Sequence, residues 1–252
     1  MFGTLSKNQS LNLNNSQMIS VVIPAKNETL SINSVISNLV TTIEFDFEIL
    51  IVVEDLNDPT IISINDEFKQ NPKIKITMNE HTSGVAGSIK TGIEKSTGSV
   101  IVITMADSSD NVSDINKMSK IVLSGYDIVV ASRYAPGGGS VNAPLLKSSL
   151  SRYSGVLLRL LTKVQTTDPT NAFKAYSRNF VSRHSIESTS GFTIGLELIG
   201  KGILEGAHIT EIPTIWTERN SGKSNFKIFK WFSSYVYWFL VCIKNRFIHV
   251  VG

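Results

Sequence analysis

The chain has 252 residues, of which 42% are hydrophobic and 18% are charged, and its formal net charge is +3. This composition is ordinary for a folded protein, and the length suits one large α/β domain or two small ones. The small net charge gives no reason to expect a nucleic-acid partner, and the single cysteine, Cys242, excludes an internal disulfide framework and a cysteine-based zinc site.

The chain begins with a polar stretch rich in Asn and Ser, so we expect residues 1–18 to form a disordered tail and not a signal peptide. From there to residue 131, short apolar runs alternate with stretches of near-helical hydrophobic spacing, which predict strands and helices respectively. We expect strands at residues 19–24, 47–53, 74–78, 100–105 and 128–131, separated by helices at 30–43, 61–68, 85–93 and 112–123. This alternation favours an α/β fold with a mainly parallel central sheet flanked by helices.

The rest of the chain changes character after a glycine-rich loop at residues 136–139. There we expect a helix at 157–164 and further strands at 172–176 and 209–215. Residues 226–247 are aromatic and apolar and predict a C-terminal aromatic helix. The expected parts are therefore the tail, one α/β domain over residues 19–225, and a C-terminal amphipathic helix over 226–252.

Acidic and amide side chains follow three of the expected strands. Asp107 follows the strand at 100–105, Glu54 and Asp55 follow the second strand, and Lys26-Asn27-Glu28 follows the first. In open α/β sheets, ligands bind outside the carboxyl ends of the strands, so these groups predict one site. We interpret it as a nucleotide-sugar site, because a divalent cation held by a carboxylate would offset the charge of a diphosphate.

Plainer explanations exist for the same residues. Asp107 could do no more than cap the helix that follows it. Adjacent acids at a buried strand end, such as Glu54 and Asp55, are costly unless something neutralises them, which favours a binding role. Residues 84–87, Gly-Val-Ala-Gly, do not form a dinucleotide fingerprint, and no Gly-x-Ser-x-Gly elbow indicates a hydrolase.

Six segments, taken in order, resemble the motifs of one enzyme family. They are residues 20–28, 53–55, 106–107, 132–134, 167–174 and 212–224. Together they resemble the inverting glycosyltransferases of family 2, which have the GT-A fold. Within that family they are most similar to the branch of the dolichol-phosphate mannosyltransferases and polyprenyl-phosphate glycosyltransferases. The resemblance extends over residues 19–226.

The chain departs from the family pattern at two motifs. Residues 54–57 read Glu-Asp-Leu-Asn where the family has Asp-Asp-Gly-Ser, and Met105 replaces the first acid of the family's Asp-x-Asp. A thioether is a poor ligand for a hard cation. A Mg²⁺ or Mn²⁺ ion would therefore rest on Asp107, with Ser109 or Asp110 and phosphate oxygens completing its coordination.

The resemblance implies roles for the matched residues. The nucleoside pocket would be lined by Pro24, Lys26, Glu28, Val53 and Asp55, and the diphosphate and metal would be met by Ala106 and Asp107. Arg133 and Arg219 would hold phosphate groups, which suits a planar guanidinium. As polar anchors near a cleft, these two arginines are not expected to belong to the core.

The resemblance implies transfer of the sugar to a polyprenyl phosphate, held by Arg133, Lys147 and Ser151. Such an acceptor is already ionised at neutral pH and needs positioning and charge compensation, but no general base. Two alternatives stay open. One is transfer to a saccharide hydroxyl in surface-polysaccharide synthesis, with Asp168 as general base. The other is a nucleotide-sugar-binding protein that has lost catalysis, which the replacement at Met105 would allow.

The aromatic run at residues 228–243 suggests contact with a membrane surface. It is too short and too interrupted to span a bilayer, but its Trp, Tyr and Phe residues and the flanking Lys227, Lys244 and Arg246 suit the membrane–water interface. We expect peripheral attachment to the cytoplasmic face of a membrane through residues 226–248, with a membrane-protein partner or a second copy of the chain left open. The alternative is a C-terminal helix that packs on the α/β domain.

Overall fold

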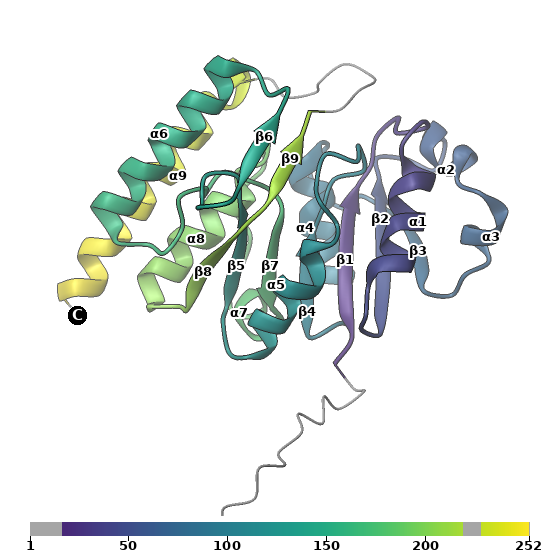
Figure 1. Ribbon diagram of the computed structural model, residues 1–252, viewed down its shortest axis with the longest axis horizontal. Coiled ribbons are helices and arrows are strands. Elements are labelled where there is room, and N and C mark those ends of the chain that lie inside the picture. Colours follow the sequence, from purple (N-terminus) through teal and green to yellow (C-terminus); the bar gives the residue numbers. More distant parts are fainter. Residues whose placement is uncertain (1–16, 219–227, 252) are drawn as a thin grey trace, which may run out of the picture.

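The computed structural model describes residues 17–218 and 228–251 (Figure 1). Its strands are β1 (Ile19–Pro24), β2 (Phe47–Val53), β3 (Ile74–Met78), β4 (Val100–Ile103), β5 (Ile128–Ser132), β6 (Gly139–Val141), β7 (Lys174–Ser177), β8 (Ile209–Pro213) and β9 (Ile215–Thr217). Its helices are α1 (Ile32–Thr42), α2 (Pro59–Ser63), α3 (Asp66–Lys69), α4 (Val85–Lys95), α5 (Asp114–Leu123), α6 (Leu145–Thr162), α7 (Arg178–Ser182), α8 (Ile194–Glu205) and α9 (Ile228–Val251).

Within the described residues, seven strands form one sheet in the order β3-β2-β1-β4-β7-β5-β8 (Figure 1). The pairs β1–β2, β1–β4, β2–β3 and β5–β8 are parallel. Strand β7 runs antiparallel between β4 and β5. The expected mainly parallel sheet flanked by helices is thus confirmed, and β7 adds an antiparallel member whose direction was not predicted.

Several expected elements have different bounds in the structure: the helix expected at 61–68 is the two short helices α2 and α3, the strand expected at 100–105 ends at Ile103, and two further differences are larger. The strand expected at 209–215 ends at Pro213, which has no N–H for a ladder bond, and residues 215–217 pair instead with β6. The helix expected at 157–164 begins already at Leu145 and forms the long helix α6. Its first half is rich in Ser, which favours caps and turns over helix interiors and so hides the helical pattern.

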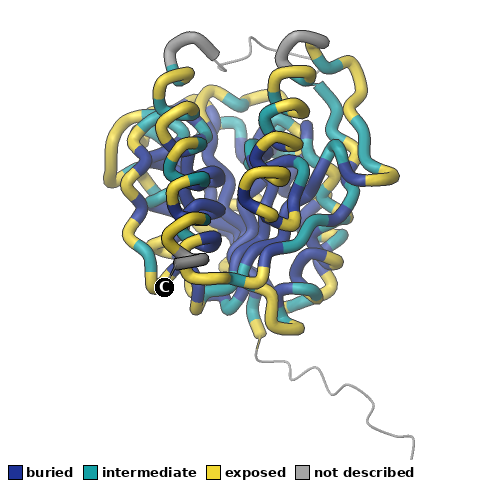
Figure 2. The backbone as a smooth tube through the Cα atoms, turned by 90° about the vertical axis from the view of Figure 1, so that its left-hand side faces the viewer, coloured by how far each residue is buried: buried dark blue, intermediate teal, exposed yellow. Residues whose placement is uncertain are grey.

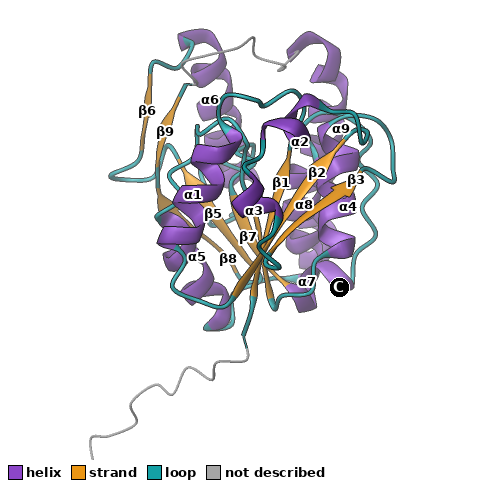
Figure 3. Cartoon of the chain, turned by 90° about the vertical axis from the view of Figure 1, so that its right-hand side faces the viewer, coloured by secondary structure: helices purple, strands orange, loops and turns teal. Residues whose placement is uncertain are grey.

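Helices cover both faces of the sheet (Figure 3). Helices α1 and α5 pack their apolar residues on one face, and α4, α7, α8 and α9 pack theirs on the other. Strands β1, β2, β4 and β5 are buried along their whole length, which explains their near-continuous apolar sequences. Helix α4 approaches β1 closely at Gly92, where an added Cβ would lie 2.2 Å from Val22 Cγ1.

Helix α9 packs on α8 and runs beside α6 (Figure 1). Trp238 and Cys242 are buried in the core on that face of the sheet, and Asn245 Nδ2 donates to the carbonyl of Gly200 at 3.0 Å. The outward surfaces of α6 and α9 are largely exposed (Figure 2). The C-terminal helix is therefore an integral wall of the domain that also presents an apolar outer side.

None of the helices in residues 17–218 and 228–251 combines the length and the apolar character that crossing a bilayer requires.

Candidate active site

A cavity of about 680 Å³ opens at the carboxyl ends of the parallel strands. Its floor is polar and comes from the ends of β1, β2, β4 and β5, with Lys26, Glu28, Glu54, Asp107 and Arg133. Its walls are largely apolar and come from α6 and α9, with Leu150, Leu157, Trp231, Phe232, Val236 and Phe239. The cavity thus joins a charged end to an apolar groove.

The loop after β4 carries the acidic residues of the floor. The N–H of Ser109 donates to Asp107 Oδ1 at 3.1 Å, and Asp110 Oδ2 accepts from Thr104 Oγ1 and the N–H of Met105, both at 3.0 Å. Burial and the neighbouring charge of Asp107 raise the pKa of Asp110 to about 7. Asp107 keeps room for a ligand, while Asp110 is tied back to its own loop.

Of the two adjacent acids after β2, only Glu54 lines the cavity. Its carboxylate accepts from the N–H of Gly84 at 2.9 Å and from the hydroxyl of Ser83. Burial alone would raise its pKa, but these hydrogen bonds lower the pKa of Glu54 below its ordinary value. Asp55, which the resemblance implies for the nucleoside pocket, is exposed and accepts from the N–H of Asn57 at 2.7 Å. Glu54 is thus the acid that faces a ligand here.

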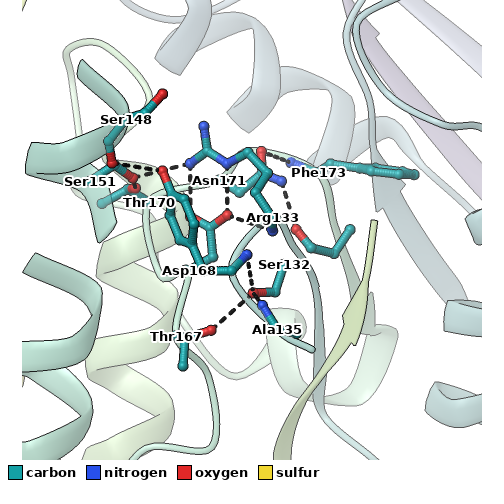
Figure 4. A network of polar contacts seen from close by, with 12 residues as sticks. Ser132, Arg133, Ala135, Ser148, Ser151, Thr167, Asp168, Thr170, Asn171 and Phe173 are labelled. Carbon is teal, nitrogen blue, oxygen red and sulfur yellow. Dashed lines mark hydrogen bonds and ion pairs between the residues drawn. The ribbon is translucent and has the colours of Figure 1, made fainter. Parts of the chain in front are cut away.

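Arg133 at the end of β5 forms a buried ion pair with Asp168 (Figure 4). The distances are 2.7 Å from Nε to Oδ2 and 2.8 Å from Nη2 to Oδ1, and the backbone N–H of Arg133 also donates to Oδ2 at 3.0 Å. The side chains are 12% and 0% exposed. Burial lowers the pKa of Arg133, but the Asp168 carboxylate outweighs it, so the pKa of Arg133 rises above its ordinary value. A buried carboxylate thus fixes Arg133, while the arginine itself still lines the cavity, so its expected role as a polar anchor near a cleft stays a prediction.

The same network reaches α6 (Figure 4). Arg133 Nη2 donates to Ser151 Oγ at 3.1 Å, and Ser151 Oγ lies 2.7 Å from Thr170 Oγ1. Arg133, Ser151 and Thr170 all line the cavity, whereas Asp168 does not. Their hydroxyls and guanidinium form a compact group of hydrogen-bond donors at the cavity, which suits an anion chemically, and the carboxylate of Asp168 holds Arg133 in this group.

The remaining expected site residues fall into three groups. Pro24, Lys26, Glu28 and Ser109 line the cavity. Val53 and Ala106 are buried in the core and do not line it. Lys147 lies in α6 but its side chain is outside the described part, and Arg219 lies wholly outside the described residues.

Two cavity residues were missed by the sequence analysis. Tyr235 lies in the aromatic run that was interpreted as a membrane contact or, alternatively, as a helix packed on the domain, but its side chain lines the cavity, and burial raises its pKa. Glu218 also lines the cavity, and its Oε2 is buried without a hydrogen-bond partner. The preceding N–H, that of Thr217, donates to the carbonyl of Ser109 at 3.0 Å, so Glu218 lies next to the acidic loop. Its position beside Arg219 in a polar segment was the available signal.

A third missed residue supports the first strand end. Asp58 caps α2 by accepting from the N–H of Thr60 at 2.9 Å, and its carboxylate also accepts from the N–H of Asn27 at 3.1 Å. The N–H of Glu28 donates to Thr60 Oγ1 at 3.0 Å. The sequence Asp-Pro-Thr carries the signal of a helix N-cap followed by Pro, but not its contact with the loop after β1.

No three His, Cys, Asp or Glu side chains in the described part of the chain come close enough together to hold a metal ion by themselves. A cation at this site would therefore share protein oxygens with those of a bound ligand.

Comparison with known proteins agrees with this geometry. The model of Glycosyl transferase family 2 matches residues 20–184. Polyprenol monophosphomannose synthase of Mycolicibacterium smegmatis is 28% identical over 145 residues, which cover 53% of this chain and 55% of the relative. Undecaprenyl-phosphate mannosyltransferase of Micrococcus luteus is 22% identical over 81% of this chain and 85% of its own length. Glycosyltransferase AglD of Haloferax volcanii is 24% identical, with 81% of this chain but 34% of the relative covered.

The match thus spans only about half the length of the first of these relatives and about a third of AglD. Among solved structures, glucosyl-3-phosphoglycerate synthase of Mycobacterium tuberculosis, in complex with Mn²⁺, UDP and glucosyl-3-phosphoglycerate, superposes with a TM-score of 0.65 at 16% identity. That likeness covers 92% of this chain and 81% of the other, and it establishes the GT-A fold.

Proposed function

The chain belongs to glycosyl transferase family 2, and we propose that it moves a sugar from a nucleotide-sugar to a polyprenyl phosphate with inversion at the anomeric carbon. The observation that carries this proposal is the two-part cavity, whose charged floor continues into apolar walls from α6 and α9. A lipid phosphate likewise joins a charged phosphate group to an apolar chain. The relatives named for polyprenol and undecaprenyl-phosphate substrates support the same acceptor class.

The donor belongs at the strand ends of β1, β2 and β4. Lys26, Glu28 and Glu54 lie where the nucleoside of the donor would bind, at the side of the cavity formed by β1 and β2. A solved GT-A neighbour holds UDP, and a mannosyltransferase relative supports a hexose. We propose either uracil or guanine as the base of the nucleotide-sugar, because both carry N–H groups that can donate a hydrogen bond to a carboxylate.

The residues at the diphosphate position fit a divalent cation. Asp107 and Ser109 offer oxygens to the cavity, and the unpartnered buried Oε2 of Glu218 beside them favours a positive charge there. Met105 contributes no ligand atom, because its thioether sulfur is too soft for Mg²⁺ or Mn²⁺. We propose Asp107 and Ser109 as the protein ligands. The ion would supply charge compensation for the leaving nucleoside diphosphate.

Arg133, Ser151 and Thr170 would hold the acceptor phosphate. One phosphate oxygen attacks the anomeric carbon from the face opposite the diphosphate, while the bond from that carbon to the diphosphate oxygen breaks. No proton has to be removed from an ionised phosphate, so positioning and charge are the main requirements. A hydroxyl acceptor would need a base, and Asp168 is already engaged by three hydrogen bonds from Arg133. This favours the phosphate over the hydroxyl.

We also propose peripheral attachment to the cytoplasmic face of a membrane through residues 226–248. Neither α6 nor α9 contains an acidic residue, and both carry Lys and Arg. Leu160 on α6 and Leu240 on α9 are 73% and 58% exposed. Basic helices with exposed apolar side chains favour an anionic lipid surface. The mouth of the cavity between the two helices would then face the acceptor.

The direct test is sugar transfer with purified protein. Labelled GDP-mannose or UDP-glucose is supplied with Mn²⁺ and farnesyl phosphate, a short acceptor that needs no membrane, or with a free saccharide. We expect label in the organic phase with farnesyl phosphate, and none with Asp107→Ala. Label only in the saccharide would establish the hydroxyl alternative. Nucleotide-sugar binding without transfer to either acceptor would mean a protein that has lost catalysis.

A further inference from the structure

Lys174 is a buried cation that the proposed reaction does not use. It is the first residue of β7, and its side chain is completely buried. Because β7 is antiparallel to its neighbours, Lys174 pairs with Ile103 at the carboxyl end of β4 and with Val130 of β5. Lys174 therefore lies directly under the functional edge of the sheet, although it does not line the cavity.

The ammonium group of Lys174 holds the loop that carries the acceptor site. Its Nζ donates to the carbonyl of Pro169 at 3.0 Å and to the carbonyl of Asn171. These two carbonyls flank Thr170, so they turn inward while the hydroxyl of Thr170 meets Ser151. Asp168, which fixes Arg133, directly precedes the same segment.

Space for this ammonium depends on a glycine. An added Cβ at Gly195 of α8 would lie 2.8 Å from Lys174 Nζ and 3.6 Å from the carbonyl oxygen of Asn171. The contact atom is the far end of a flexible side chain, so a methyl group there would displace the ammonium without breaking the helix. The absence of a side chain at Gly195 therefore leaves the space that the ammonium group of Lys174 occupies.

The charge of Lys174 also matters to an anion above it. The charged groups that act on it are Asp168 and Arg133. Glu197 of α8 is occupied elsewhere, by Lys201 and the N–H groups of residues 187 and 188. Arg133 and Asp168 cancel each other, so a protonated Lys174 leaves this cluster of three side chains with one net positive charge, whereas Asp110 acts on Arg133 from the loop after β4. Burial lowers the pKa of Lys174, Asp168 raises it and Arg133 lowers it, and the net result is a pKa of about 7.

We propose that Lys174 is a positioning residue of the acceptor-phosphate site, which sets Thr170 and the Asp168–Arg133 pair and supplies the excess positive charge of the cluster. This inference rests on the proposed acceptor. A lysine with this role differs from a purely structural lysine in one measurable way. The protein with protonated Lys174 binds the acceptor phosphate more tightly than the protein with neutral Lys174. Strongly shifted buried groups next to a cleft are candidates for such roles.

The experiment measures binding of farnesyl phosphate by the fluorescence of Trp216 and Trp231, which line the cavity. Three variants are compared with the wild type: Lys174→Met, Gly195→Ala, and Gly202→Ala as a control on the same helix. At Gly202 an added Cβ would lie 3.1 Å from Ile209 Cδ1 and reaches no residue of the site. We expect Lys174→Met to weaken binding by about tenfold or more, as for one lost charge-assisted contact. Gly195→Ala should fall between it and the wild type, and Gly202→Ala should bind normally.

Measuring the dissociation constant at a series of pH values distinguishes a charge-dependent positioning role of Lys174 from a role in packing alone. Between pH 7.5 and 9 the phosphate is already a dianion, while Lys174 must take up a proton on binding. The wild-type dissociation constant should therefore rise by up to about tenfold per pH unit, and that of Lys174→Met should stay flat. Binding of UDP and GDP should change by less than about twofold in every variant, because the contacts of Lys174 all lie on the acceptor side.

Two results would overturn the inference in different ways. If the wild type binds farnesyl phosphate and both Lys174→Met and Gly195→Ala bind it equally well at every pH, Lys174 is only structural. If the wild type does not bind farnesyl phosphate at all, the proposed acceptor fails and this inference fails with it. Should Lys174→Met not fold, Gly195→Ala decides, because it keeps the lysine and perturbs only the position of its ammonium.

Discussion

Replacing Asp168 by Asn tests whether this carboxylate supports Arg133 or acts as a base. Asp168 accepts three hydrogen bonds from Arg133, and its side chain is fully buried. Asn offers one acceptor oxygen, so its NH₂ group must face at least one arginine donor. The guanidinium would also lose its counter-charge. Breaking a buried ion pair costs about 3–5 kcal/mol, which corresponds to a fall in Tm of about 6–20 °C for a domain of this size.

The assay is thermal unfolding of Asp168→Asn beside Asp46→Asn. Asp46 also pairs with a basic side chain at 2.7 Å, that of Lys73, but this pair is about half exposed. Exposed pairs contribute about 1 kcal/mol or less, so the control should melt close to the wild type. If Asp168→Asn also melts like the control but loses all transfer to a hydroxyl acceptor, the support role is refuted and Asp168 is the general base. Transfer to farnesyl phosphate should weaken through a raised KM, because Arg133 is no longer fixed.

Two further predictions follow from the cavity and its surroundings. Asp107→Ala, or an excess of chelator added to the wild type, should reduce turnover by at least about a hundredfold. The substitution should change Tm little, because Asp107 faces the cavity and not the core. Undiminished activity in excess chelator would show that the reaction needs no divalent cation. The double variant Leu160→Asp/Leu240→Asp should lose flotation with anionic vesicles yet keep transfer to farnesyl phosphate, because both side chains are exposed. Flotation equal to the wild type would remove these two helices from the membrane contact.

The sheet edge that carries the site could be predicted because its signals are local. Each of β1, β2 and β4 is an apolar run that ends in polar residues, and parallel strands place such endings together. The direction of β7 could not be predicted, because it depends on a pairing with β4 and β5 that lies far away in sequence. That pairing places Lys174 under the cavity, so the role that we propose for this lysine could not be predicted either.

The choice among adjacent residues at the site was decided by tertiary contacts. Glu54 and Asp55 read alike in sequence, but Glu54 turns inward because the N–H of Gly84 and the hydroxyl of Ser83 bind it. Arg133 was expected as a polar anchor near a cleft, but the carboxylate that fixes it lies 35 residues later and could not be predicted. The cost of a buried charge depends on its partner, and partners at such distances leave no local pattern.

Helix α9 shows why composition alone could not separate a membrane contact from a core helix. Trp238 and Cys242 are buried against α8, while Tyr235 and Phe239 line the cavity and Leu240 faces outward. The side chains of the aromatic run therefore face three environments around one helix: the core, the cavity and the outer surface. Because the helix seals part of the core, it cannot leave the domain to reach a bilayer without exposing that core and opening the cavity wall. If the proposed attachment holds, the domain must approach the membrane as a whole, with α6 and α9 leading and the mouth of the cavity between them.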